Sequence, residues 1–70
     1  MKVSARNQFK GKIVSMNEGA VNTIVCLDIG GGNIITSTIS KSAAVDLQLE
    51  VGVDAYAIIK ATSVMIGIDD

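Results

Sequence analysis

The chain has 70 residues, of which 49% are hydrophobic and 3% aromatic, and its formal net charge is −1. This length allows one domain over residues 1–70, and the charge does not favour general nucleic-acid affinity. No apolar run reaches the ~20 residues of a membrane span, and the start lacks the apolar core of a signal peptide, so we expect a cytoplasmic protein.

The first predicted strand covers residues 7–16 (NQFKGKIVSM). Alternation places Ile13 on one face and Met16 on the other, and Gly11 indicates a bulge or a sharp coil. Residues 17–20 (NEGA) then predict a turn.

Two further strands follow in chain order. Residues 21–29 (VNTIVCLDI) show the clearest alternation of apolar and polar side chains. Residues 30–33 (GGGN) predict a hairpin loop, and the β-branched residues of 34–40 (IITSTIS) favour a strand.

The second half of the chain begins with a helical segment. Residues 41–52 favour a helix of about two turns, and either Ser40 or Ser42 could cap it. Residues 54–60 (DAYAIIK) and 64–68 (VMIGI) predict a fourth and a fifth strand.

This order predicts an all-β fold, a five-stranded OB-type Greek-key barrel with a short helix between strands 3 and 4. The aliphatic content is high for a domain of this size, which buries only about 60% of its unfolded surface as a monomer. We therefore expect part of the apolar surface to be buried between subunits.

The sequence lacks the residues that several kinds of catalytic and metal-binding site require. The chain has no histidine, and its only cysteine, Cys26, lies within a predicted strand. Catalytic triads and soft-metal sites need more such groups, and the acids are too scattered for a carboxylate pair. The GGGN loop opens no helix, so it does not predict a phosphate-binding loop. We expect no enzyme activity and no metal coordinated directly by the protein.

The remaining polar groups are mostly hydrogen-bond donors, which suit an oxyanion. Three stretches have this character: SARN (4–7), KATS (60–63) and the helix start at 40–43. Four of the six basic residues also lie within the first twelve positions. Taken alone, SARN favours a solvated terminus, KATS a polar turn and Ser40 a helix cap over a binding site.

Three features resemble the Mop (molybdenum-pterin-binding-like) family: SARNQFKGKIV near the start, a [T/S]-x-x-S-like stretch before LQLEVG, and AIIKATSVMI near the end. The resemblance covers essentially the whole chain. It implies an OB-type barrel that binds molybdate or tungstate as a ligand. It also implies a homo-oligomer, a hexamer built as a trimer of dimers, with oxyanions held at subunit interfaces for molybdenum storage or homeostasis.

The resemblance also implies the site residues. One subunit contributes Ser4, the backbone of Ala5 and Arg6, and Lys60 with Ala61; the other contributes Ser40 and the backbone near Ala43. The family's usual serine would fall at position 43, which is alanine here, so Ser42 could occupy that role instead. A second oxyanion site would involve Gly19 and Ala20.

Two other classes of function remain as alternatives. An OB-fold module that binds single-stranded nucleic acid would need aromatic stacking platforms, but the chain offers only Phe9 and Tyr56. A purely structural oligomerisation module is the third reading. A start at Met1 and an end just after the fifth predicted strand favour a free-standing domain over a fragment.

Overall fold

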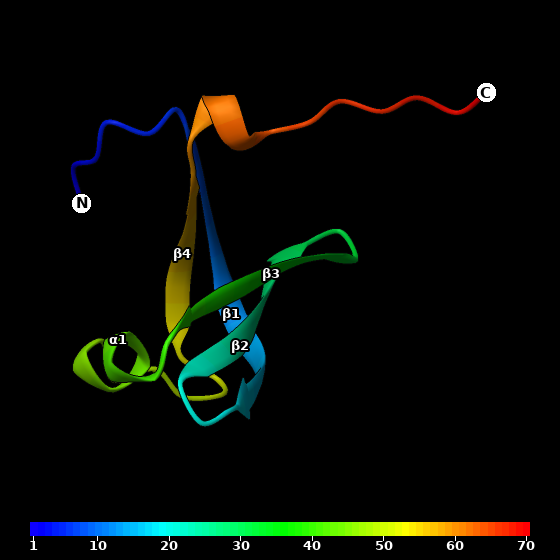
Figure 1. Cartoon of the computed structure of the whole chain (residues 1–70). Helices are drawn as coiled ribbons and strands as arrows, with labels where there is room; N and C mark the ends of the chain where they lie inside the picture. The colour runs from blue at the N-terminus through cyan, green and yellow to red at the C-terminus, as the bar shows by residue number, and fades with distance from the viewer.

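The computed structural model describes residues 1–70 and contains one antiparallel sheet of four strands in the order β3-β2-β1-β4. The elements are β1 (Asn7–Glu18), β2 (Asn22–Gly30), β3 (Asn33–Ser40), α1 (Lys41–Asp46), β4 (Asp54–Ile59) and the 3-10 turn η1 (Ala61–Ser63). The sheet is strongly bent, so that the β1–β4 ribbon crosses the β2–β3 hairpin (Figure 1). This confirms the predicted fold class and the position of the helix. Neither helical segment is long and apolar enough to span a membrane.

β1 is shared by two neighbours, because its first half pairs with β4 and its second half with β2. The register shifts between Ile13 and Ser15, which marks a β-bulge. Ile13 lies opposite Leu27 and Met16 opposite Val25, and both partners are buried. The prediction that Ile13 and Met16 point to opposite faces is therefore wrong, since the bulge adds one residue and reverses the alternation.

Gly11 lies where the β2 backbone approaches β1 closely. A Cβ atom at this position would overlap the carbonyl oxygen of Asp28, so a side chain would push the two strands apart. The predicted bulge is therefore not at Gly11 but farther along β1, between Ile13 and Ser15, and what requires glycine at position 11 is the close approach of the two backbones.

The glycine-rich segment is a tight hairpin between β2 and β3, as predicted. Gly31 and Gly32 both have positive φ angles, of 62° and 79°, as a type I′ turn requires. The Asp28 carboxylate accepts a 2.8 Å hydrogen bond from the Gly30 N–H. The Asn33 side-chain amide donates to the Gly30 carbonyl at 3.2 Å. Side chains at the base of the loop therefore provide hydrogen-bond partners for both backbone groups of Gly30.

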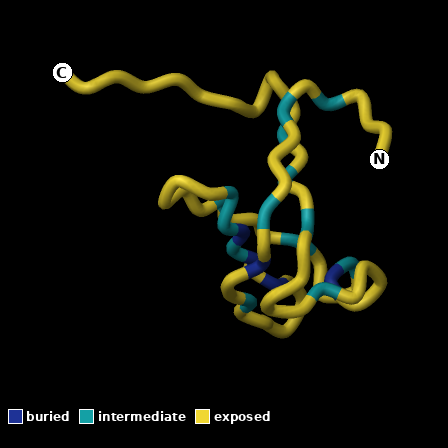
Figure 2. The backbone as a smooth tube through the Cα atoms, turned by 180° about the vertical axis from the view of Figure 1, so that it is seen from behind, coloured by how far each residue is buried: buried dark blue, intermediate teal, exposed yellow.

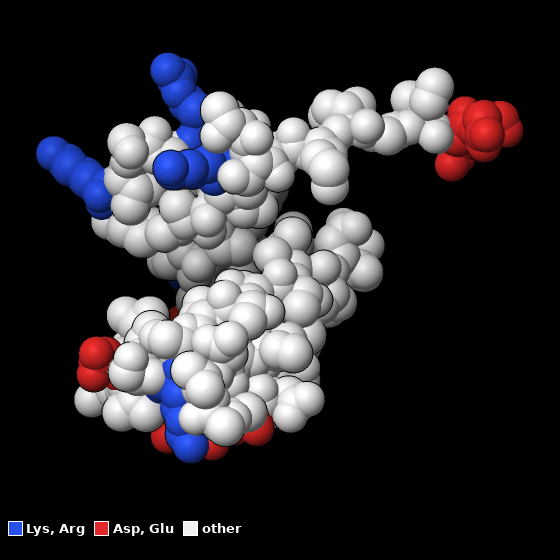
Figure 3. Space-filling model, in the orientation of Figure 1, with Lys and Arg blue, Asp and Glu red and all other residues white.

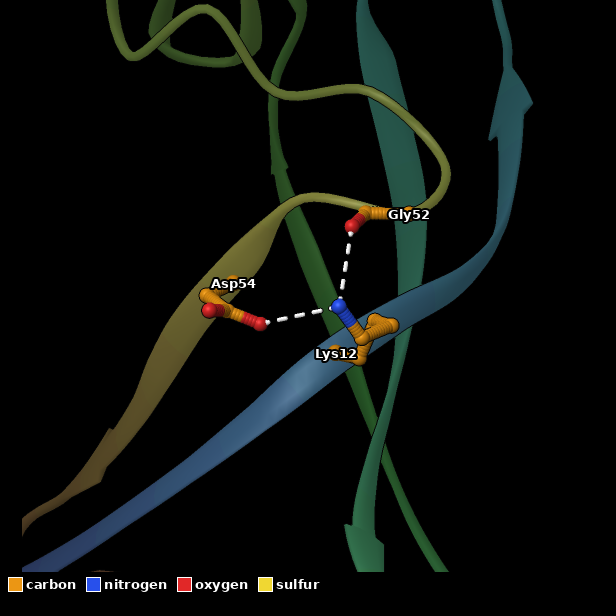
Figure 4. A network of polar contacts seen from close by, with 3 residues as sticks. All are labelled: Lys12, Gly52 and Asp54. Atoms are coloured by element: carbon orange, nitrogen blue, oxygen red, sulfur yellow. Dashed lines mark hydrogen bonds and ion pairs between the residues drawn. The ribbon is translucent and has the colours of Figure 1, made fainter.

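The segment between α1 and β4 is hydrogen-bonded to β1. The Gly52 N–H donates to the Ile13 carbonyl at 2.8 Å, and the Ile13 N–H donates to the Val53 carbonyl at 3.0 Å. The Lys12 ammonium donates to the Gly52 carbonyl at 3.3 Å and to the Asp54 carboxylate at 3.1 Å (Figure 4). These contacts set the register in which β4 pairs with β1.

The fifth predicted strand is absent from the sheet of this chain. Residues 64–68 form no regular element, and the chain after η1 runs away from the rest of the molecule (Figure 1). A strand needs a neighbour to pair its backbone groups. The strands at both edges of the sheet, β3 and β4, have one unpaired side each.

The core of the isolated chain is small (Figure 2). Only 5 of 70 residues are buried: Ile13, Thr23, Val25, Leu27 and Ala44. Large hydrophobic side chains stay exposed along the whole chain, from Phe9 in β1 to Ile68 in the tail. The predicted excess of aliphatic surface is therefore present, and one chain does not cover it.

Candidate functional site

The SARN and KATS stretches lie side by side, because β1 begins where β4 ends. Asn7 pairs with Ile59 in the sheet register, and the Asn7 side-chain amide donates to the Ile59 carbonyl at 3.3 Å. A hollow of about 420 Å³ opens beyond this pair. It is lined by Val3, Ser4, Ala5, Arg6, Ile58, Lys60, Ala61 and Thr62. The structure thus brings together Ser4, Ala5 and Arg6 with Lys60 and Ala61, and we call this the terminal hollow.

Backbone donors in the terminal hollow come from the η1 turn. The Ser63 N–H donates to the Lys60 carbonyl at 2.9 Å, and the Val64 N–H to the Ala61 carbonyl at 3.3 Å. The amides of Ala61 and Thr62 precede these bonds and have no partner within the turn. Thr62 also adds a hydroxyl group. It was not among the predicted site residues, although its position directly after Lys60 and Ala61 was a usable signal.

The charge around the terminal hollow is positive and uncompensated. The only ion pair in the structure joins Lys12 to Asp54, so Arg6 and Lys60 have no carboxylate partner. Figure 3 shows Lys and Arg side chains gathered at this end of the molecule, with acidic groups at the opposite end and at the tip of the tail. A hollow with cations, free amides and hydroxyls but no carboxylate in its lining is suited to an anion.

The other predicted half of the site lies at the start of α1. Ser40 is the helix N-cap, and its hydroxyl oxygen accepts a 3.0 Å hydrogen bond from the Ala43 N–H. The Ser42 hydroxyl lies 3.2 Å from that of Ser40. Because the Ala43 amide is already occupied by the cap, the side-chain donors that remain here are the paired hydroxyls of Ser40 and Ser42.

The two predicted halves of the site, at the start of α1 and in the terminal hollow, lie at opposite ends of the folded molecule (Figures 1 and 2). The Lys41 N–H donates to the Val21 carbonyl at 2.8 Å, which holds the start of α1 beside the β1–β2 turn. The terminal hollow is at the other end of β1, whose 12 residues span up to roughly 36 Å. One small anion therefore cannot contact both halves of the same chain.

The predicted second site falls at the β1–β2 turn. A shallow hollow of about 410 Å³ is lined by Asn17, Gly19, Ala20, Val21, Asn22, Ile24 and Thr38. The Gly19 N–H donates to the Asn22 carbonyl at 2.7 Å and so is not a free donor. No Lys or Arg lines this hollow, which makes its donor set weaker than that of the terminal hollow.

Cys26 lies on the face of the sheet opposite the core, between Ser15 and Thr36. Hydrogen bonds from the Ser15 and Thr36 hydroxyls lower the pKa of the Cys26 thiol. The Cys26 sulfur lies 3.7 Å from the Thr36 hydroxyl. No group of three or more His, Cys, Asp or Glu side chains that could hold a metal ion occurs in the structure.

Comparison with known proteins gives consistent results. Residues 3–66 match the sequence model of the TOBE domain. A probable molybdenum-pterin-binding protein of Haemophilus influenzae is 64% identical over 69 residues, covering 99% of this chain and 100% of that protein.

Solved structures share the same fold. MopII of Clostridium pasteurianum, in an apo form, is 45% identical, with a TM-score of 0.90 over 96% of this chain and 100% of that chain. ModG, a cytoplasmic molybdate-binding protein solved with molybdate bound, is 40% identical, with a TM-score of 0.93 over 99% of this chain and 49% of ModG.

Proposed function

Since this chain belongs to the TOBE-domain family, we propose that it binds molybdate or tungstate reversibly in the cytoplasm, for molybdenum storage or homeostasis, and catalyses no reaction. The observation that carries the proposal is the convergence of Ser4–Arg6 with Lys60–Thr62 in a hollow that has cations and donors but no acid. The description of ModG, which was solved with molybdate bound, supports molybdate as the anion, and the name of the Haemophilus relative supports a molybdenum-containing ligand.

Donor chemistry accounts for selectivity among tetrahedral anions. Sulfate is smaller than molybdate and would leave donors unpaired, at about 1–3 kcal/mol for each buried unsatisfied group. Phosphate carries at least one proton near neutral pH, and a hollow built from donors offers that proton no acceptor. The lining also contains no aromatic ring on which a pterin could stack, so we propose the bare oxyanion as the ligand.

We propose that each site is completed by a second subunit of a homo-oligomer, a hexamer arranged as a trimer of dimers. One subunit supplies Ser4, Ala5, Arg6, Lys60 and Ala61, and its neighbour supplies Ser40 with Ser42 or Ala43. The separation of these halves within one chain supports this arrangement, as does the exposed aliphatic surface. Gly19 and Ala20 remain candidates for a second oxyanion site.

The register of the sheet argues against the nucleic-acid alternative. Phe9 pairs with Ala57 and Lys10 with Tyr56, so Phe9 and Tyr56 point to opposite faces of the β1–β4 ribbon. They do not form a common platform on which successive bases could stack.

Native mass spectrometry with and without molybdate tests both parts of the proposal. We expect hexamers that gain mass in steps of one molybdate, and no such steps with sulfate at the same concentration. A mass step equal to a molybdenum-pterin would replace the oxyanion as the ligand. Chains that stay monomeric and bind no molybdate would contradict the proposal.

A further inference from the structure

Asn7 and Gln8 carry side-chain amides at the start of β1, directly after the segment that lines the terminal hollow. Neither residue lines the hollow itself. Each side-chain amide nevertheless donates a hydrogen bond to a backbone carbonyl within or next to the lining. The Asn7 amide donates to the Ile59 carbonyl at 3.3 Å, and the Gln8 amide donates to the Ala5 carbonyl at 3.2 Å. Both bonds therefore act on the backbone that carries the donors.

The Asn7 bond fixes the two halves of the donor set relative to each other. Asn7 is the first residue of β1 and follows Arg6, while Ile59 is the last residue of β4 and precedes Lys60. Asn7 and Ile59 form the last pair of the β1–β4 register, at a place where strand ends commonly fray. A side-chain bond across this last pair holds Arg6 and Lys60 at the same end of the β1–β4 ribbon (Figure 1).

The Gln8 bond fixes the direction of a backbone donor. The Ala5 carbonyl and the Arg6 N–H belong to one peptide unit, and the chain has no cis peptide bond, so these two groups point in opposite directions. Because the Gln8 amide holds the Ala5 carbonyl on its own side, the Arg6 N–H is directed away from Gln8. The Arg6 N–H has no backbone partner in the chain, so it stays free to donate to an anion.

We propose that Asn7 and Gln8 are positioning residues, whose side-chain amides hold the Ser4–Arg6 backbone in its binding geometry before the anion arrives. This inference rests on the proposed function. A segment that precedes the first strand is otherwise free to move, and it loses conformational entropy when it closes on a ligand. Two bonds that order the segment in advance remove part of that loss and so raise the affinity for the anion.

Substitutions of the exposed Gln8 side chain test the orientation of the Arg6 amide. Gln8→Met keeps the length of the side chain but removes its donor, so we expect the affinity for molybdate in isothermal titration calorimetry to fall about fivefold. Gln8→His, measured at about pH 8, offers an imidazole N–H at a similar reach without a charge and should restore most of the affinity. Unchanged affinity in Gln8→Met would overturn the role of Gln8, as would an equal loss in both variants.

A matched pair of substitutions tests the bond across the strand ends. Asn7→Leu is close to isosteric and removes the donor, so its affinity for molybdate should also fall about fivefold. Asn7→His keeps an N–H near the position of the asparagine amide and should restore most of the affinity. Urea unfolding of each variant checks that a loss of affinity is not a loss of fold. Equal affinity of Asn7→Leu and the unmodified chain would overturn the role of Asn7.

NMR relaxation of the backbone amides, recorded without any anion, gives a measurement of order that does not depend on binding. We expect the order parameter of the Arg6 N–H to be about 0.85 in the unmodified chain, as in a rigid backbone, and below about 0.6 in Gln8→Met. A segment that is equally ordered in both chains would overturn the positioning role. A segment that loosens in Gln8→Met without any loss of affinity would also overturn it.

These measurements separate the positioning role from the proposed function. An unmodified chain that binds no molybdate contradicts the proposed function, while a fall of the Arg6 order parameter in Gln8→Met still supports the ordering of the segment by Gln8. Molybdate binding by the unmodified chain, with the same affinity in Gln8→Met and Asn7→Leu, overturns the positioning role alone.

Discussion

Lys60 is one of the two cationic residues that line the terminal hollow, the other being Arg6. It follows the last residue of β4, and no carboxylate pairs with its ammonium group. We predict that Lys60→Gln weakens molybdate binding about tenfold or more, because a charge-assisted hydrogen bond contributes roughly 1.5–3 kcal/mol. Isothermal titration calorimetry measures this loss, and Lys10→Gln, outside the lining, is the control. Equal affinity in both variants would show that Lys60 is only a solvated turn residue.

Cys26 provides a prediction that does not involve the anion. The Ser15 and Thr36 hydroxyls lower the pKa of its thiol, so the thiolate should form at lower pH in the folded chain than in the unfolded one. The rate of alkylation by iodoacetamide should therefore reach half its maximum at lower pH in the native chain than in urea. Thr36→Val should raise this midpoint; a midpoint that does not move would mean that the hydrogen bond is absent in solution.

The same pKa shift has a consequence for stability. Because the folded-state pKa of Cys26 is the lower one, folding favours the thiolate. The stability contributed by this group is present above the unfolded-state pKa and is lost as pH falls through the folded-state value.

The limits of sequence-based prediction are clear at the scale of single residues. From residue types alone, Ser4–Asn7 and Lys60–Ser63 were predicted as two separate candidate stretches. Only the family resemblance placed them in one binding site. Their contact depends on β1–β4 pairing, which brings together residues 52 positions apart, as in the Asn7–Ile59 bond. Thr62 lay within the KATS candidate stretch and next to two predicted site residues, but it was not itself among the predicted site residues.

At the scale of elements, local signals predicted the structure well. The GGGN hairpin and the helix cap depend on neighbours within three residues. The hairpin formed as predicted, and of the two candidate caps, Ser40 and Ser42, the structure uses Ser40. The bulge after Ile13 is set by pairing with β2 and by the Gly52–Val53 loop, so alternation alone could not locate it. The prediction of a strand over residues 64–68 is wrong for this chain, because the segment has no neighbouring strand with which to pair.

The start of α1 yields a prediction that separates stability from binding. Ser40→Ala removes the cap and should destabilise the chain by about 1 kcal/mol in urea unfolding, whereas Ser40→Asp preserves a capping oxygen. Both should weaken molybdate binding, and Ser40→Asp should do so more strongly because its carboxylate repels the anion. Normal binding by the stable Ser40→Asp variant would place α1 outside the site.

At the scale of the whole molecule, the fold and the binding residues are separable. None of the five buried residues lies before Ile13, so the segment before β1 contributes little to the core. That segment nevertheless supplies Val3–Arg6 to the terminal hollow. Residues that stabilise the barrel and residues that we propose bind the anion thus occupy different parts of the chain.

A chain that begins at Gln8 tests this separation. It keeps all four strands, apart from Asn7, and should fold with nearly unchanged circular dichroism. It loses the Ser4 hydroxyl, the backbone amides of Ala5 and Arg6 and the Arg6 charge together. Lys60 and the η1 amides, which remain, then supply only part of the donors that four anion oxygens need. We therefore expect molybdate affinity to fall by orders of magnitude.

Thermal unfolding provides the measurement, because a ligand that binds only the folded state raises its melting temperature. At a molybdate concentration of about 100 times Kd, the full chain should gain about 2.7 kcal/mol, while the chain that begins at Gln8 should gain nothing. A chain that begins at Ser4 removes only Met1–Val3 and should keep most of the gain, which controls for truncation itself. If all three chains gain equally, the anion binds away from Ser4–Asn7, and the proposed role of this segment is wrong.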